Sequence, residues 1–134
     1  MSTPIGPYTP IVRAGPWLIC SGQLGLHQPS AGGSGPGATA VRSSPVLVEG
    51  GAPAQLTQAL SNAEALLRGQ GAAPEDVVKT TVFVTDASQF PGVNEAYVAF
   101  FGTHRPARSM VAVSALPAGA AVEVEVWAYA PLDG

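Results

Sequence analysis

The chain has 134 residues, of which 46% are hydrophobic and 11% charged, and its net charge is −3. Its length predicts a single domain over residues 1–134. A charged share well below the usual level of about 25% leaves few charges to keep copies apart, so we expect self-association. Six Lys and Arg residues against nine Asp and Glu disfavour nucleic acid as a partner, because phosphate binding needs many cations.

Neither a signal peptide nor a membrane span is expected. The segment MSTPIGPYTP lacks the basic start and apolar core of a signal peptide. No apolar run approaches the roughly 18 to 20 residues of a membrane span. Cys20 is the single cysteine, which excludes a disulfide within the chain and a thiolate metal cluster. We therefore expect a cytoplasmic protein without membrane contacts.

The N-terminal third predicts a hairpin followed by a long loop. Two apolar runs on either side of AGP predict a β-hairpin whose second strand ends near CSGQ. Residues 27–45 are rich in Gly, Ser and Pro without periodicity, which predicts an exposed loop. GPGATA in this loop distantly resembles a dinucleotide fingerprint, but the strand and helix that phosphate binding requires do not flank it. PVLVEGG predicts a short strand.

The clearest helical signal lies in APAQLTQALSNAEALLRGQG, residues 52–71. Pro53 suits a first helical turn, and Gly69 or Gly71 can end the helix. The apolar residues fall on one face at helical spacing: Leu56, Ala59, Leu60, Ala63, Leu66 and Leu67. This face predicts core packing rather than a site.

The second half predicts a strand, a helix and two further strands. EDVVKTTVFVTD is dense in β-branched residues and reads as a strand, with Asp86 or Ser88 as the following helix cap. A second helix is predicted from about Pro91 to Phe101. RSMVAVSALPAGAAVEVEVWAYAP predicts two strands joined as a hairpin by the turn LPAG. The element order indicates an α+β fold, with two helices on one face of a mixed sheet.

The last strand suggests what the other face of this sheet does. In VEVEVWA the valines at 122, 124 and 126 point one way, while Glu123, Glu125 and Trp127 point the other. The second set forms either a solvated face or a surface that packs against other subunits and carries a carboxylate.

The stretch HRPARSMVAV contains two of the six basic residues. Arg108 opens an alternating strand, and its planar guanidinium suits a carboxylate or phosphate. Glu123 is ionised at neutral pH and can hold a water molecule. In the predicted hairpin Arg108 lies opposite positions 127–129, so Arg108 and Glu123 can both face a ligand.

Other reactive residue types have structural explanations. His104 is interpreted as a helix-end or loop residue, and Cys20 as a buried thiol. Ser21 has no base near it that would make it a nucleophile. Two histidines far apart do not make a metal site, so no metal is expected.

The chain resembles the Rid family of reactive intermediate deaminases, also called YjgF-like proteins. IGPY, SGQ, VVKTTVFVTD, VNEAYVAFF, RPARSMVAV and LPAGAAVEVEVWA occur in the family's order over nearly the whole chain. The exception is the Gly/Ser loop at residues 27–45, which is about 15 residues longer than in compact members at little cost in closure entropy. The favoured interpretation is that the additional loop residues are solvated and have no function. The alternative is that the loop, which carries His27, acts as a lid over the cleft.

The resemblance implies a chorismate mutase-like α+β fold, a homotrimer and ligand clefts between subunits. The implied activity is hydrolysis of enamines and imines such as 2-aminoacrylate to 2-keto acids and ammonia, without a cofactor. Arg108 would bind the substrate carboxylate and Glu123 would position or activate the water. The residues expected to line the cleft are Tyr8, Ser21, Gly22, Asn94 and Met110.

Two residues depart from the family pattern or lie outside it. Met110 stands where the family often has Cys, so a thiol role is lost while a backbone contact can remain. Arg105 lies before Pro106 and outside PARS, the core of the match, and is interpreted as a solvated loop charge.

Two other functions stay open. A nonenzymatic trimer that binds a 2-keto acid or a related anion would use the same cleft. An endoribonuclease or translation inhibitor is disfavoured by the acidic charge balance and the lack of a basic, aromatic stripe.

Overall fold

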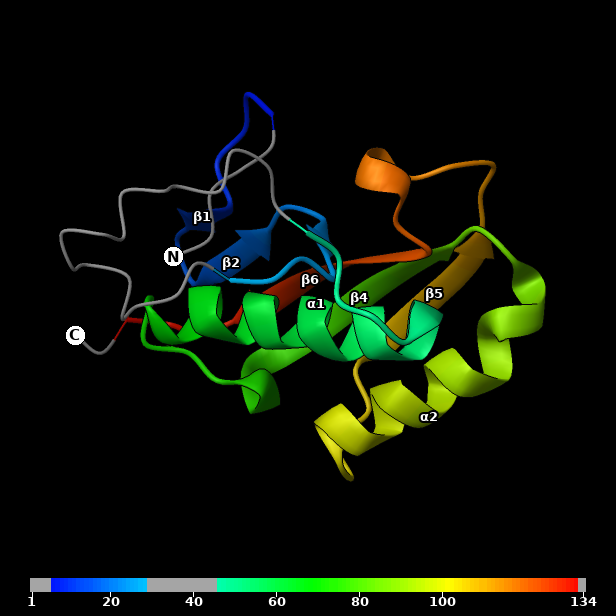
Figure 1. Ribbon diagram of the computed structural model, residues 1–134. Helices are drawn as coiled ribbons and strands as arrows, with labels where there is room; N and C mark the ends of the chain where they lie inside the picture. The colour runs from blue at the N-terminus through cyan, green and yellow to red at the C-terminus, as the bar shows by residue number, and fades with distance from the viewer. Residues whose placement is uncertain (1–5, 29–45, 133–134) are drawn as a thin grey trace, which may run out of the picture.

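The computed structural model describes residues 6–28 and 46–132 as one layered α+β arrangement (Figure 1). The strands are β1 (Ile11–Ala14), β2 (Trp17–Cys20), β3 (Gln23–Leu24), β4 (Val77–Val84), β5 (Ala107–Ala112) and β6 (Val122–Tyr129). The helices are α1 (Gly51–Arg68) and α2 (Phe90–Phe101), with short 3-10 turns at Pro74–Asp76, Ala87–Gln89 and Pro117–Gly119.

The strands form one mixed sheet in the order β1-β2-β6-β4-β5, and β3 pairs with β6. Among the described strands only the β4–β5 pair is parallel, and α2 makes the crossover between its two strands. Both helices lie on the same face of the sheet (Figure 1). The predicted α+β class with two helices on one face is therefore confirmed.

The predicted hairpin between the last two strands is wrong. β4 lies between them, pairing in parallel with β5 and antiparallel with β6. Val84 shows this most directly, because its two register partners are Ala112 and Val122. The LPAG segment is a 3-10 turn within a connection that crosses the end of β4. Arg108 therefore does not lie opposite positions 127–129.

Two smaller predictions near the N-terminus have different outcomes. The first hairpin is confirmed, with Ile11 paired to Cys20 and Gly15 in the left-handed conformation of the turn. The described part of PVLVEGG, residues 46–51, does not form the predicted strand, since it contributes one isolated bridge between Leu47 and Leu26. Residues 29–45 of the predicted loop lie outside the described residues.

The core forms between α1 and the sheet. All six apolar residues predicted for the inner face of this helix are buried: Leu56, Ala59, Leu60, Ala63, Leu66 and Leu67. They face the buried valines of β6 at 122, 124 and 126, and each fully buried Leu or Val side chain contributes about 1.5 to 3 kcal/mol. Gly69 caps the helix C-terminus, as one of the two predicted endings requires.

Candidate functional site

Arg108 is an exposed residue near the start of the edge strand β5. Its register partner is Thr80, which is fully buried beneath the helices, so Arg108 points to the helix-covered face. The guanidinium Nη1 donates a hydrogen bond of 2.8 Å to Oδ1 of Asn94 on α2. The structure thus brings together two of the predicted site residues, Arg108 and Asn94.

Tyr97 completes this arrangement. The guanidinium carbon of Arg108 lies 4.8 Å from the centre of the Tyr97 ring, and the Tyr97 hydroxyl is 2.8 Å from Oγ1 of Thr80. Burial is the main cause that raises the pKa of Tyr97, while Thr80 and the charge of Arg108 act in the opposite direction. The sequence places Tyr97 on the apolar side of the helix, so its contact with a charged group was missed. Its spacing of three residues from Asn94 was the available signal.

Met110 lies two residues beyond Arg108 and therefore on the same face of β5. It pairs with the buried Val82 and packs partly against the core. Its side chain forms an apolar, half-buried surface next to the guanidinium.

Glu123 occupies the opposite face of the sheet. It alternates with the buried Val122 and Val124, so its half-buried carboxylate points away from the helices. Burial raises the pKa of Glu123, and the neighbouring carboxylate of Glu125 raises it further. The group is therefore disposed to hold a proton more readily than an exposed glutamate.

Gly22 lies directly against this carboxylate. A Cβ atom built on Gly22 would stand 2.1 Å from Oε2 of Glu123, a distance that no real contact allows. The adjacent Ser21 donates from Oγ to the carbonyl of Thr9 at 2.6 Å, which accounts for its hydroxyl without any catalytic base. Tyr8, also predicted for the site, is exposed and lies one residue before Thr9.

Two buried polar residues of α1 hold the chain next to Gly22. Nδ2 of Asn62 donates to the carbonyl oxygens of Leu24 and Leu26 at 3.1 and 3.0 Å. Oε1 of Gln55 accepts from the backbone N–H of Ala121, close to the start of β6. The helix therefore anchors both segments that meet at the Glu123 carboxylate.

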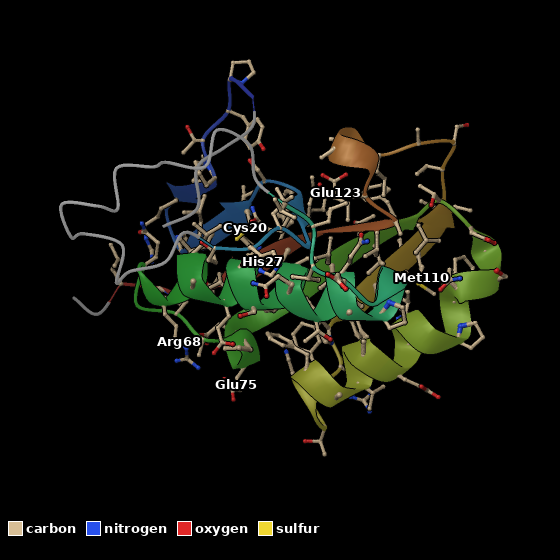
Figure 2. All side chains as sticks on the ribbon, in the orientation of Figure 1. Cys20, His27, Arg68, Glu75, Met110 and Glu123 are labelled. Atoms are coloured by element: carbon tan, nitrogen blue, oxygen red, sulfur yellow. The ribbon has the colours of Figure 1, made fainter. Side chains whose placement is uncertain are left out.

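The predicted site residues thus fall into two groups within one chain. The guanidinium group consists of Asn94, Arg108 and Met110 on the helix-covered face. The carboxylate group consists of Gly22 and Glu123 with the adjacent Ser21, and Figure 2 labels Glu123 and Met110 on their separate strands. Tyr8 is placed only by its neighbour Thr9, which accepts the hydrogen bond from Ser21. The structure does not bring Arg108 and Glu123 to the same face of one sheet.

The residues with predicted structural roles have contacts that agree with those roles. Cys20 is buried, and burial raises the pKa of its thiol to about 12, so it stays protonated. His104 Nε2 lies 2.7 Å from the carbonyl oxygen of Val77. Arg105 is exposed, and its guanidinium donates to the carbonyl oxygens of Gly102 and His104.

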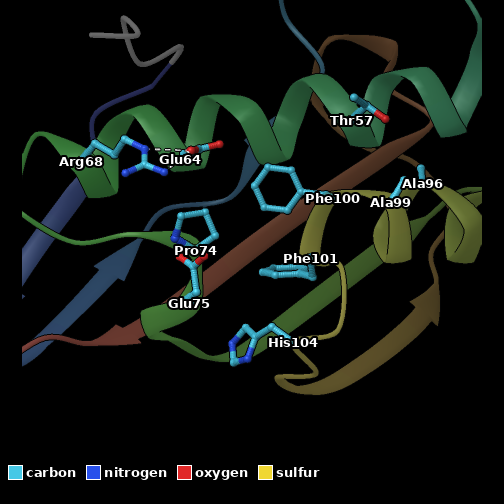
Figure 3. Close-up of a pocket in the computed structure, with 10 residues that line it drawn as sticks. All are labelled: Thr57, Glu64, Arg68, Pro74, Glu75, Ala96, Ala99, Phe100, Phe101 and His104. Atoms are coloured by element: carbon cyan, nitrogen blue, oxygen red, sulfur yellow. Dashed lines mark hydrogen bonds and ion pairs between the residues drawn. The ribbon is translucent and has the colours of Figure 1, made fainter.

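A groove of about 460 Å³ lies elsewhere, between α1 and α2 (Figure 3). Phe100, Phe101 and His104 line one part of it, and the ion pair between Arg68 and Glu64 borders another. None of the predicted site residues lines this groove.

Among residues 6–28 and 46–132, no group of three His, Cys, Asp or Glu side chains could hold a metal ion. No helix in this part of the chain is long and apolar enough to cross a membrane.

Known proteins resemble this chain over almost its whole length. The family model described as Endoribonuclease L-PSP matches residues 1–130. A RutC family protein of Pyrococcus horikoshii is 36% identical over 94% of this chain and 89% of its own. The mouse (Mus musculus) 2-iminobutanoate/2-iminopropanoate deaminase is 39% identical over 90% of this chain and 79% of its own. The crystal structure of the E. coli YjgF gene product has a TM-score of 0.79 and 34% identity, covering 96% of this chain and 91% of that one.

Proposed function

Because this chain belongs to the Endoribonuclease L-PSP family, which includes the YjgF or Rid proteins, we propose that it is an enamine and imine deaminase. The substrates are small carboxylate-bearing intermediates of the 2-aminoacrylate type, and the products are 2-keto acids and ammonia. Relatives named 2-iminobutanoate/2-iminopropanoate deaminase support this proposal at 35% to 39% identity. The proposed location is the cytoplasm.

The position of Arg108 is the observation that carries the proposal. Its Nη1 is bound to Asn94, while no protein acceptor for Nε or Nη2 is present in the described part of the chain. A carboxylate can therefore bind the unoccupied edge of the guanidinium in the two-point geometry typical of arginine. A 2-imino acid or a 2-keto acid has such a carboxylate next to its reacting carbon.

An enamine such as 2-aminoacrylate first takes a proton on its terminal carbon and becomes the imine, and hydrolysis then requires a water molecule at the C=N carbon. Water adds to the C=N carbon as the nitrogen takes a proton, and the resulting carbinolamine expels ammonia to leave the C=O group. Glu123 can hold the attacking water and take up its proton when ionised, and can return a proton when neutral. Its raised pKa favours this exchange near neutral pH more than an exposed glutamate would. No cofactor is needed for these steps.

A complete site needs a second copy of the chain. Arg108 and Glu123 point to opposite faces, so one chain offers two half-sites, each of which can complete a half-site on a neighbour. The open face of the sheet also presents the partly exposed rings of Trp17, Trp127 and Tyr129, which pack edge to face. We propose a homotrimer in which this face meets other subunits and the substrate binds between them.

The test is keto-acid release from an amino-acid dehydratase that generates the imine, assayed with and without this protein. Wild-type protein is expected to accelerate release, and Arg108→Ala is expected to abolish the gain. Arg105→Ala is the matched control, because this neighbouring arginine binds carbonyl groups at the end of α2. Equal rates of keto-acid release with wild type and with Arg108→Ala would overturn the proposal.

The same samples distinguish two other functions. A nonenzymatic binding or regulatory trimer would bind a 2-keto acid through Arg108 without accelerating imine hydrolysis. An endoribonuclease, the activity in the description of the family model, would cleave RNA in a preparation free of contaminating nuclease. The excess of nine acidic over six basic residues argues against RNA as the substrate.

A further inference from the structure

Arg108 is exposed on an edge strand, where a long side chain can adopt many rotamers. An arginine loses considerable rotamer freedom when it is held in one orientation, and a mobile guanidinium binds a carboxylate less tightly than a preorganised one. The contacts that restrict Arg108 before a ligand arrives therefore affect how well it binds.

The contacts come from one face of α2. Asn94 and Tyr97 are three residues apart and so lie on the same side of the helix. Asn94 holds Nη1 by a hydrogen bond of 2.8 Å, and the Tyr97 ring lies under the guanidinium carbon at 4.8 Å. The hydrogen bond to Asn94 fixes the position of Nη1, and the Tyr97 ring supports one face of the guanidinium group.

The Tyr97 ring is itself held in place. Only 4% of the residue is exposed, and its ring packs against Phe101 with 4.8 Å between ring centres. Its hydroxyl is bound to Oγ1 of Thr80, which is fully buried on β4. Thr80 is also the register partner of Arg108, so the ring is tied to the strand next to the one that carries the arginine.

We propose that the ring of Tyr97 is a positioning residue for Arg108, holding the guanidinium so that Nε and Nη2 face an incoming carboxylate. The attraction between the cation and the electron-rich ring face supplies the contact, and the bond to Thr80 keeps the ring from turning. This inference rests on the proposed function for its ligand, but the order of the Arg108 side chain does not depend on any reaction.

The first measurement is made by NMR on the full-length protein without ligand. In wild type, the side-chain protons of Arg108 are expected to show upfield ring-current shifts and a high order parameter at Nε–Hε. Their signals are assigned by their loss in Arg108→Ala. Random-coil shifts for these protons would overturn the inference whatever the variants do.

Two substitutions at Tyr97 separate the ring from its hydroxyl. Tyr97→Leu removes the ring, so the Nε–Hε order parameter should fall and the dissociation constant for pyruvate should rise about 2- to 10-fold. Tyr97→Phe keeps the ring face but loses the bond to Thr80, so both values should change by less than in Tyr97→Leu. Phe100→Leu is the matched control, since it removes a ring of the same helix that packs against Phe101 instead.

The outcomes also distinguish this inference from the proposed function. An unchanged order parameter in folded Tyr97→Leu, or equal losses in Tyr97→Phe and Tyr97→Leu, would overturn the positioning role. If Tyr97→Leu does not fold, the wild-type ring-current shifts and the Tyr97→Phe comparison still decide the matter. An ordered Arg108 in a protein without deaminase activity would overturn the proposed function and leave the positioning role standing.

Discussion

Arg108 and Glu123 lie on opposite faces of one sheet, on two strands that both pair with β4. Arg108 pairs with Thr80 and Glu123 pairs with Phe83, and these two positions of β4 are three residues apart. Because side chains alternate along a strand, an odd separation puts the two on different faces. This relationship underlies the proposal that neighbouring copies share each site.

Mixed assemblies test this sharing. Arg108→Ala and Glu123→Gln should each be inactive alone, but a mixture refolded at equal amounts should recover about one quarter of wild-type activity if each site joins two subunits of a ring. The recovery arises because a site is intact when an unmodified Arg108 meets an unmodified Glu123 from its neighbour. The assay is keto-acid release, and no recovery in a mixture shown to exchange subunits would contradict a shared site.

The open sheet face should control assembly. Trp127 is 40% exposed on this face, and Trp127→Lys would place a charge where subunits are proposed to meet. We expect the variant to sediment mainly as a monomer at chain concentrations of about 10 µM, in analytical ultracentrifugation. Val98→Lys is the control, because Val98 is 45% exposed on α2. An assembly unchanged by the Trp127 substitution would place the interface elsewhere.

Gly22 should be sensitive to the smallest side chain. Gly22→Ala would put a Cβ atom 2.1 Å from Oε2 of Glu123, so the carboxylate must move away. Because that atom is the end of a flexible side chain, we expect the fold to persist while kcat falls by about 10- to 100-fold. Circular dichroism and the deaminase assay measure the two effects. Gly69→Ala, whose Cβ meets its nearest neighbour at 3.5 Å, should leave kcat unchanged.

The pH dependence of stability should reveal Glu123. Its pKa in the folded chain lies above the ordinary value of 4.5, because of burial and the charge of Glu125. The folded state therefore binds more protons than the unfolded chain in this window, and the stability from this group is lost as pH rises through the folded pKa. The free energy of unfolding of Glu123→Gln minus that of wild type should thus be more positive at pH 7 than at pH 4.

Urea unfolding at one fixed chain concentration measures this difference, since assembly also contributes to stability. Glu95→Gln, a change of an exposed carboxylate on α2, is the comparison. If the free energy of unfolding of Glu123→Gln differs from that of wild type by the same amount at both pH values, the raised pKa of Glu123 is contradicted.

The local patterns of the sequence determined the helices and the direction of most side chains. The six apolar residues of α1 are spaced so that only one face can be buried, and the alternation in VEVEVWA separates the valines from Glu123 and Glu125 whatever the strand pairs with. The motifs around Arg108 and Glu123 were also sufficient to select both residues.

Tertiary structure alone decided which strands are neighbours. The turn LPAG permits a hairpin, but the crossover through α2 places β5 parallel to β4, whose other edge is then taken by β6. That pairing moves Arg108 away from positions 127–129, brings it to Asn94 and Tyr97, and sets it on the face opposite Glu123. Short-range patterns specify what each strand buries, but pairing depends on contacts between residues far apart in the chain, which no local pattern encodes.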